Sequence, residues 1–569
     1  MKFRMELPPE LRGALQAATA DWQANNKVAR FWQKDSSLWT GEGEEQWLGW
    51  IDIVERQQTQ LPLFADLAAD VRKAGFESLL LLGMGGSSLC PEVLAETFGQ
   101  QPGFPALHIV DSTNPAQVKA VRDKVNLAKT LVVVASKSGS TLEPNVLKQY
   151  FFEEMKKAVG ADQAGGHFIA ITDPGSKMEQ VAKADGFRAI YYGDPQIGGR
   201  YSALSNFGVV AATIAGLDTA RLLDEAARAV ASAKEEPVAN PAVQLGLAMG
   251  LAANEGRDKI TLFTSPEIYD LGAWMEQLIA ESTGKLGKGI TPVDREAIAV
   301  PADYAHDRIF VYVRLAETAD PSLDVKVAAL EAAGHPVVHF ELEDRYGIFG
   351  QFFTWEVATA IAGSVMGINP FNQPDVESAK IATRALTTAY EETGKLPERT
   401  PVFEEKGVHL YATDNYATKL RDVAGDATLV GYLRAHLAQI KAGDYFATLA
   451  YLPMFPEYEA IIQRLRHRVL DARHVATCVG FGPRFLHSTG QDYKGGPNTG
   501  VFLQITADTA KDLAIPGQTY SFGVVLAAQA AGDLTVLEER GRRALCIRLG
   551  KDVSAGLKML DKAVAEALK

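Results

Sequence analysis

Short apolar runs alternate with stretches of helical spacing along most of the chain. Five runs of strand length occur between about residues 76 and 217, at Ser78–Leu82, Ala106–Val110, Leu131–Ala135, Phe168–Ile171 and Ala189–Tyr192. Continuous apolar runs are typical of strands buried on both faces, as in a parallel sheet covered by helices. The stretches between them, such as Glu143–Val159, have apolar residues at helical spacing. This pattern predicts a doubly wound α/β domain.

The same alternation continues after this domain. A second α/β unit is expected from about residue 219 to 392, with strands at Lys259–Phe263, Arg308–Val313 and Val337–Leu342. Beyond the turn-rich segment Glu391–Glu398 we expect a third unit, with strands at Tyr445–Tyr451, Val475–Val479 and Thr499–Ile505 and a helix at Pro456–Asp471. The predicted organisation is therefore a tryptophan-rich helical segment packed on a neighbouring domain (1–60), two α/β domains with doubly wound parallel sheets (61–220 and 221–392), and a C-terminal α/β region (393–569).

Composition and charge narrow the class of protein. Of the 569 residues, 47% are hydrophobic and 22% are charged, which excludes wholesale disorder. The net charge is −13, whereas a nucleic-acid-binding protein needs a basic face. No apolar run reaches the ~18–20 residues of a membrane span, and the first nine residues have no apolar core of signal-peptide length. Three scattered cysteines are too few for a disulfide framework or a zinc site, so we expect a cytoplasmic protein without a metal.

A glycine-rich motif, Gly83-Met84-Gly85-Gly86-Ser87-Ser88, directly follows the first predicted strand. Its glycines let the backbone approach a ligand closely, and the next helix offers unpaired N–H groups to an anion. A dinucleotide-binding fingerprint is an alternative, which Asp111 at the end of the next strand supports. That fingerprint has glycine or alanine at its sixth position, where this chain has Ser88.

A hydroxyl-rich loop follows the Leu131–Ala135 strand. Around Gly139, hydroxyl or ammonium groups come from Ser136, Lys137, Ser138, Ser140 and Thr141. Such a loop can surround a phosphate with donors, and the following helix directs its positive end toward it. A single hydroxyl would indicate an ordinary helix cap, but four around one glycine favour phosphate binding.

Two further segments carry candidate side chains. Arg200 follows two glycines, from where it can either point into a cleft or lie on the surface.

A helix is predicted over Pro266–Ser282, with Gln277 and Glu281 four residues apart on one face. A glutamate in the last turn is disfavoured by the helix dipole. A site that needs a general base can tolerate it, but the spacing alone favours an ordinary helix residue.

Two loops complete the set of candidates. The turn-rich stretch Gly367–Pro374 leads into a helix that contains Lys380, and by itself it is compatible with a purely structural loop. The stretch Leu486–Asn498 places His487 among hydroxyl groups and glycines. A loop this rich in functional groups is a candidate site.

Taken together, these segments resemble the glucose-6-phosphate isomerase family, which is built from sugar-isomerase (SIS) domains. The matches fall in the family's order over about 300 residues, at Gly83–Ser87, Ser136–Glu143, Gly198–Ser202, Gln277–Lys285 and Gly367–Lys380. The tryptophan-rich start and the His487 loop make the chain most similar to the isomerase half of bacterial transaldolase/glucose-6-phosphate isomerase fusions. The length leaves no room for a transaldolase barrel of ~250 residues beside the three units.

The resemblance implies a role for each matching residue. Glu281 is the base that moves a proton between C2 and C1, Arg200 stabilises the enediolate, and Gln277 positions the substrate hydroxyls. Lys380 assists ring opening together with a histidine. The family histidine lies between the glutamate and the lysine, where this chain has His306, His335 and His339 outside any recognised motif, so we expect His487 instead. The sugar phosphate is held by Gly86, Ser87, Ser136, Lys137, Ser138 and Thr141.

The sequence thus predicts an aldose–ketose isomerase of glucose 6-phosphate and fructose 6-phosphate that needs no cofactor. The resemblance also implies a homodimer, while the charge and the short apolar runs lead us to expect no nucleic-acid or membrane partner. Two other functions stay open at this point. A non-catalytic sugar-phosphate-binding module would keep the hydroxyl-rich loop without needing Glu281 and Arg200 together. An NAD-dependent dehydrogenase would use the glycine-rich motif and Asp111.

Overall fold

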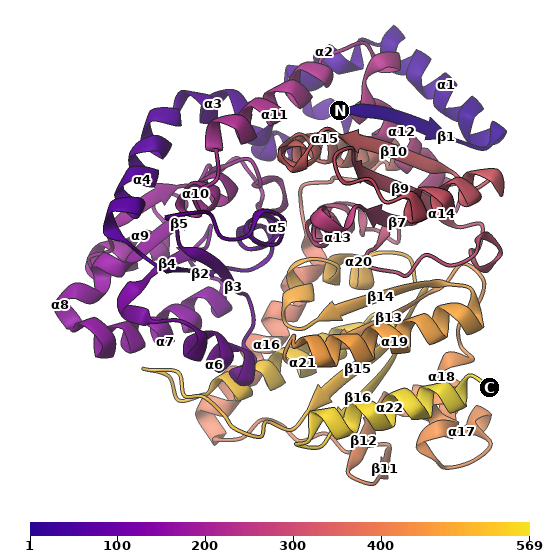
Figure 1. Ribbon diagram of the computed structural model, residues 1–569. Coiled ribbons are helices and arrows are strands. Elements are labelled where there is room, and N and C mark those ends of the chain that lie inside the picture. Colours follow the sequence, from indigo (N-terminus) through magenta and orange to yellow (C-terminus); the bar gives the residue numbers. More distant parts are fainter.

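The computed structural model describes residues 1–569 and contains three sheets (Figure 1). The first sheet is wholly parallel, and its strand order is β3 (Ala106–Val110), β2 (Ser78–Leu82), β4 (Thr130–Ala135), β5 (Phe168–Thr172) and β6 (Ala189–Tyr192). All five strands lie where the apolar runs predict them. The order reverses between β2 and β4, and ligands of doubly wound sheets bind at such a switch point.

Helices cover both faces of this sheet, as expected for a doubly wound unit. They are α3 (Ile53–Thr59), α4 (Leu61–Ala74), α5 (Leu89–Phe98), α6 (Pro115–Lys124), α7 (Leu142–Val159), α8 (Ala161–Ala164), α9 (Lys177–Ala184) and α10 (Asn206–Ile214).

The second sheet has the order β1 (Lys2–Glu6), β10 (Val337–Leu342), β9 (Arg308–Leu315), β7 (Lys259–Thr264) and β8 (Thr291–Val293). Strand β1 runs antiparallel to β10, and Figure 1 shows it in indigo at this sheet's edge. The expectation of a purely helical segment over residues 1–60 is therefore wrong at its start. Charged residues alternate with apolar ones along β1, so that it fits an edge strand with one polar face.

Seven helices accompany the second sheet, and a long helix follows them. They are α1 (Pro9–Ala24), α2 (Lys27–Trp32), α11 (Thr219–Ser232), α12 (Pro241–Asn254), α13 (Leu271–Thr283), α14 (Pro321–Ala332), α15 (Ile348–Met366) and then α16 (Pro374–Thr393). The helix predicted over Pro266–Ser282 is in fact two elements, a 3-10 turn at Pro266–Ile268 and α13. The break follows from tertiary contacts, because the buried Asp270 between them pairs with Arg295.

The third sheet has the order β11 (Phe403–Glu405), β12 (Val408–Tyr411), β16 (Arg543–Leu549), β15 (Gly500–Ala507), β13 (Tyr445–Ala450) and β14 (Ala476–Phe481). The last four strands are parallel, while β11 and β12 are antiparallel additions at one edge. Its helices are α17 (Asp414–Ala424), α18 (Leu429–Leu437), α19 (Pro456–Arg473), α20 (Gly490–Gly495), α21 (Phe522–Glu539) and α22 (Val553–Ala567).

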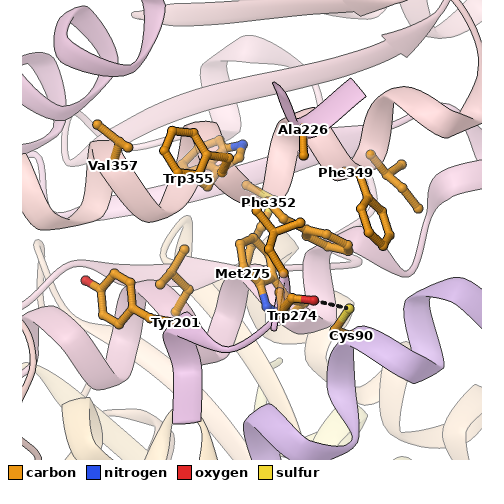
Figure 2. Close-up of a cluster of buried hydrophobic side chains, with 14 of the residues drawn as sticks. Cys90, Tyr201, Ala226, Trp274, Met275, Phe349, Phe352, Trp355 and Val357 are labelled. Atoms are coloured by element: carbon orange, nitrogen blue, oxygen red, sulfur yellow. Dashed lines mark hydrogen bonds between the residues drawn. The ribbon is translucent and has the colours of Figure 1, made fainter. Parts of the chain in front are cut away.

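One large apolar core joins the first two sheets (Figure 2). Its centre is α15, in which only Ser364 and Val365 are not buried, as expected for a helix that is apolar on all sides. The tryptophan-rich start packs here as predicted, since Trp50 is fully buried and stacks on Tyr201 with ring centroids 4.9 Å apart. This packing fixes the backbone beside Arg200.

The third unit is attached to the first by apolar contacts and to the second by polar ones. Ile515, Phe522 and Val525 belong to the same buried cluster as the apolar face of α7. In α20, the buried Gln491 donates to the carbonyl of Gly284 at the end of α13 (2.8 Å). No helix in the structure combines the length and the apolar character needed to cross a membrane.

Glu356 is a buried carboxyl group in α15, and neither of its oxygens has a hydrogen-bond partner. Burial raises its pKa well above the ordinary value of 4.5, so the folded protein keeps a proton that the unfolded chain releases. Because the pKa of Glu356 is raised in the folded state, its contribution to the free energy of unfolding is most favourable below pH 4.5. This contribution is lost as the pH rises.

We therefore expect Glu356→Gln to raise the free energy of unfolding at pH 8 by about 1–3 kcal/mol. At pH 4 the change is expected to be small, because the carboxyl group is then protonated in both states. Urea unfolding at the two pH values measures this difference. An equal effect at pH 4 and pH 8 would contradict the argument.

Candidate active site

A cavity of about 220 Å³ lies at the switch point of the first sheet. The end of β2 leads into one wall and the end of β4 into another, while α13 and the turn Gly199–Tyr201 close it from the second unit's side. Ten residues predicted for the site line it: Gly86, Ser87, Ser136, Lys137, Ser138, Thr141, Arg200, Gln277, Glu281 and His487. Ser140 and Lys380 do not.

The hydroxyl-rich loop has free donors toward the cavity. The hydroxyl of Ser136 is buried and has no partner in the protein, and the side chain of Thr141 does not cap α7 although Thr141 precedes its first residue. An ordinary cap would use that hydroxyl on the helix backbone. Gly139 has φ +66°, and a Cβ there would lie 2.3 Å from the backbone nitrogen of Met178. The loop therefore needs glycine at this position, and it leaves two hydroxyls for a ligand.

Other members of this loop are already engaged. The ammonium of Lys137 donates to Asp173 (2.9 Å) and to the carbonyl of Asp194 (2.8 Å). The hydroxyls of Ser138 and Ser140 lie 2.7 Å apart, and Ser140 is exposed. Of these, Lys137 and Ser138 still face the cavity, whereas Ser140 supports Ser138 from outside it.

The glycine-rich motif is shaped by the protein's own backbone. A Cβ on Gly86 would lie 1.9 Å from the carbonyl oxygen of Gly199, so the two loops touch here. Asp111 is buried, accepts a hydrogen bond from Ser88 (3.3 Å) and lies 3.5 Å from the guanidinium of Arg484. Burial raises the pKa of Asp111 to about 6. A carboxyl group held in this way is not presented to a ribose, which disfavours the dinucleotide interpretation.

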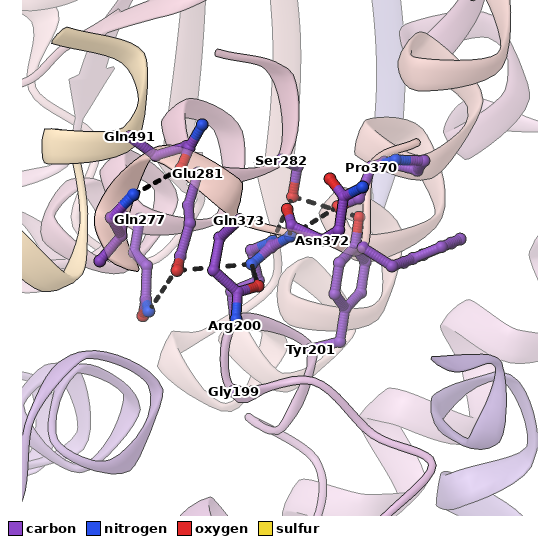
Figure 3. Close-up of polar contacts among 12 residues, drawn as sticks. Gly199, Arg200, Tyr201, Gln277, Glu281, Ser282, Pro370, Asn372, Gln373 and Gln491 are labelled. Atoms are coloured by element: carbon purple, nitrogen blue, oxygen red, sulfur yellow. Dashed lines mark hydrogen bonds and ion pairs between the residues drawn. The ribbon is translucent and has the colours of Figure 1, made fainter. Parts of the chain in front are cut away.

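Arg200 points into the cavity from the turn Gly199–Tyr201 and is only 2% exposed (Figure 3). Its Nε donates to Ser282 (2.9 Å), and one terminal nitrogen donates to the carbonyl of Pro370 (2.9 Å). The other terminal nitrogen donates to Gln373 (3.0 Å). A guanidinium held at every nitrogen is a fixed positive charge, because it has little freedom to rotate.

Glu281 and Gln277 face this guanidinium from α13. An oxygen of Glu281 lies 3.4 Å from the nearer terminal nitrogen of Arg200, and its other oxygen accepts a hydrogen bond from the Gln277 amide (2.9 Å). The Gln277 carbonyl oxygen is buried without a partner. The structure thus brings together a carboxylate, a fixed cation and an unused acceptor. The four-residue spacing predicts only that Gln277 and Glu281 share a face, and the pairing with Arg200 is implied by the resemblance.

His487 reaches the cavity from the third unit, in the 3-10 turn Arg484–His487. Its Nε2 lies 3.0 Å from Glu143 in the first turn of α7. Burial alone would raise the pKa of Glu143. The charge and hydrogen bond of His487, together with a backbone hydrogen bond and the charge of Lys380, outweigh it, and the pKa lies below the ordinary value. None of His306, His335 and His339 lines the cavity. All three bond elsewhere in the second unit: His306 to Arg257, His335 to the carbonyl of Pro301, and His339 to Glu331.

Lys380 lies outside the cavity. Its side chain is 44% exposed, and its ammonium is 3.4 Å from Glu377 of the same helix. Its charge nevertheless contributes to the lowered pKa of Glu143, which places it on the side of the Glu143–His487 pair.

Sequence reasoning missed several residues at the site. Trp47 and Phe371 supply apolar walls, and Gln373 lines the cavity while it holds Arg200. Glu143 lies in a motif that was recognised, but it was given no role. The only local signals for these residues are that Trp47 lies among other tryptophans and that Gln373 lies in a turn-rich loop.

The comparisons with known proteins point to one family. The family model for phosphoglucose isomerase matches residues 71–298, a range that holds the hydroxyl-rich loop, Arg200 and Glu281 but not His487. The glucose-6-phosphate isomerase of Rubrobacter xylanophilus is 29% identical over 379 residues, which are 58% of this chain and 87% of that protein. The probable glucose-6-phosphate isomerase of Methanococcus maripaludis is 30% identical over 359 residues, 55% of this chain and 79% of that protein.

Solved structures agree at the level of the fold. A hypothetical protein of Thermus thermophilus has a TM-score of 0.58 at 23% identity and covers 68% of this chain, with 99% of its own length matched. A glucose-6-phosphate isomerase from Chlamydia trachomatis has a TM-score of 0.50 at 20% identity, covering 62% of this chain and 76% of its own. About four-fifths of the Methanococcus protein is matched at 30% identity, and the family model covers residues that form the main walls of the cavity. The chain therefore belongs to the phosphoglucose isomerase family.

Proposed function

We propose that this protein interconverts glucose 6-phosphate and fructose 6-phosphate, with Glu281 as the proton-transferring base. The observation that carries the proposal is the placement of Glu281 3.4 Å from the fixed guanidinium of Arg200, in a cavity whose other end is the hydroxyl-rich loop. The proposal also rests on the names of its relatives.

The phosphate group is assigned to the loop after β4. The free hydroxyls of Ser136 and Thr141 and the amino-terminal end of α7 can donate to its oxygens. Ser87 and Gly86 lie on the adjoining wall. Because the phosphate is remote from the reacting carbons, its binding energy serves to orient the sugar.

The proton transfer follows from the chemistry of the two sugars. Glu281 removes the proton from C2 of the open-chain aldose, and the electron pair forms a C1–C2 double bond with negative charge on the carbonyl oxygen. Arg200 lies beside the carboxylate and is suited to stabilise that charge. The hydroxyl proton on O2 then moves to O1, Glu281 returns its proton to C1, and the carbonyl forms at C2 as the C1–C2 double bond is lost. Gln277 holds the substrate hydroxyls. Since hydrogen only moves within the substrate, the step requires no external redox cofactor.

Ring opening precedes this step, and we assign it to His487. It has to move a proton between the ring oxygen and the anomeric hydroxyl, for which an imidazole is suited near neutral pH. Lys380, by its charge on the same side, assists through Glu143.

A non-catalytic binding module is the alternative function. It would need the phosphate loop alone, and a carboxylate buried beside a fixed guanidinium would be an unnecessary cost to stability. The test is a coupled assay with fructose 6-phosphate in the presence of EDTA. Glucose 6-phosphate formation supports the isomerase and its independence of a metal, and binding without turnover would favour the module.

Thr141→Ala tests the phosphate loop. We expect KM for fructose 6-phosphate to rise about tenfold, because one hydroxyl donor to a dianion is lost, while kcat changes by less than about twofold. Steady-state kinetics measure both. Thr535→Ala removes a threonine hydroxyl from the exposed side of α21 and is the matched control. An unchanged KM in Thr141→Ala would count against this loop.

We also propose that the enzyme is a cytoplasmic homodimer, on the family resemblance alone. Light scattering after size exclusion tests the oligomeric state, and a mass of one chain would contradict a dimer.

A further inference from the structure

A buried chain of polar side chains lies behind His487. Glu143 accepts a hydrogen bond at Oε1 from His487 (3.0 Å) and, at the same oxygen, one from the amide of Gln529 in α21 (2.6 Å). The hydroxyl of Thr113, in the loop after β3, donates to the carbonyl oxygen of that amide (2.6 Å). Glu143, Gln529 and Thr113 are at most 4% exposed. Gln529 thus acts on the cavity only through Glu143.

The contacts fix which way round the Gln529 amide lies. Its oxygen receives the Thr113 hydroxyl, so its nitrogen faces Glu143. In the reverse orientation an amide oxygen would meet a carboxylate oxygen at 2.6 Å, which requires a protonated carboxyl group. The pKa of Glu143 is lowered rather than raised, and the amide therefore donates to an ionised carboxylate.

An ionised Glu143 in turn determines the proton on His487. Because a carboxylate only accepts hydrogen bonds, the Nε2 of His487 has to carry the hydrogen that points to it. The other ring nitrogen, Nδ1, makes no hydrogen bond to the protein, and the ring lines the cavity. When the charged ring gives up its second proton, the free lone pair is therefore on Nδ1, on the side that a substrate can reach.

We propose that Gln529 is a positioning residue of the isomerase site, which keeps Glu143 a hydrogen-bond acceptor and so fixes the protonated nitrogen of His487. The part played by His487 in the reaction rests on the proposed function, but the arrangement of the proton does not. Gln529 comes from the third unit and lies 386 positions from Glu143. The third unit thus supplies both His487 and the group that sets its protonation.

Three other titratable groups interact electrostatically with Glu143 or His487. Lys380 of α16 favours the ionised form of Glu143, Tyr451 after β13 is influenced by Glu143, and Asp111 after β3 interacts with His487. None of them is changed by substituting Gln529, so a difference between variants reports on the amide.

The first test is Gln529→Met, which keeps the size of the side chain and removes its donor. Without the donor the ionised form of Glu143 is less well stabilised, and the proton between His487 Nε2 and Glu143 shifts toward Glu143. We expect kcat to fall about tenfold with little change in KM, and the acid limb of the pH profile of kcat to move to higher pH. Gln504→Met is the matched control, because Gln504 is an equally buried glutamine of the third unit that bonds only within that unit.

The second test is Gln529→Glu, which places two carboxyl groups at the 2.6 Å separation of the present contact. They can share one proton, and the protonated group can donate as the amide did. We expect activity close to that of the wild type at low pH and a steep loss as the shared proton dissociates. This variant also serves if Gln529→Met does not fold, which circular dichroism checks. A purely structural role would lower activity equally at every pH.

A measurement without turnover separates this inference from the proposed function. Nitrogen-15 chemical shifts of the histidine rings, assigned with His487→Gln, identify the protonated nitrogen of His487 at pH 8. We expect hydrogen on Nε2 in the wild type and in Gln504→Met, and a population with hydrogen on Nδ1 in Gln529→Met. If the protein has no isomerase activity but the shifts behave in this way, only the proposed function fails. An identical His487 state in both variants overturns the role of Gln529.

Discussion

Replacing Glu281 by glutamine is expected to lower kcat by about 10³-fold and to leave KM for fructose 6-phosphate within about threefold. A general base contributes roughly 10²–10⁴ to a rate, and the amide cannot accept the carbon-bound proton. The phosphate loop is untouched, so substrate binding is retained. Steady-state kinetics give both values, and exchange of the C2 hydrogen with deuterated water, followed by NMR, reports on proton abstraction directly.

The control for this variant is Glu276→Gln on the same helix. Glu276 neighbours Gln277 in sequence but lines a different cavity, between α13 and the third unit. Burial raises its pKa well above the ordinary value, which favours the neutral carboxyl group, and glutamine is close to that group in shape. We expect its kcat to be that of the wild type. Near-normal turnover in Glu281→Gln would remove Glu281 as the base.

Arg200→Lys is expected to lower kcat by about 10²-fold or more. Lysine keeps the charge but not the planar fork that bonds Ser282, Pro370 and Gln373 at once. Losing one preorganised donor to a developing oxyanion costs about 10²–10³ in kcat. The measurement is kcat at saturating substrate, together with the affinity for a stable enediolate analogue, which is expected to weaken more than that for substrate.

Arg466→Lys separates this effect from a general loss of packing. Arg466 is 1% exposed and bonds to Thr477 and to the carbonyl of Asp294, away from the cavity. We expect it to lower the thermal midpoint without lowering kcat. If Arg200→Lys and Arg466→Lys lose activity to the same degree, Arg200 acts through stability rather than through the transition state.

The elements that sequence reasoning predicted well are those with a strong local pattern. The buried strands of the first sheet appear as apolar runs because both faces of each strand are covered. Strand β16 was missed because its uninterrupted apolar part spans only Ala544–Ile547, and β1 because it is a short edge strand with alternating charges. The break before α13 was missed because it depends on a contact between Asp270 and Arg295.

The sequence by itself determined the three α/β units, the hydroxyl-rich loop after a strand and the shared face of Gln277 and Glu281. These features are local, since a run of residues decides its own backbone conformation and which of its side chains lie together. The sequence favours His487 over His306, His335 and His339 by the composition of its loop. Only the tertiary structure decided that this loop reaches the cavity and that Glu143 and Gln529 lie behind His487. His487 and Glu143 lie 344 positions apart, and no periodicity in a sequence records how three separate sheets pack against one another.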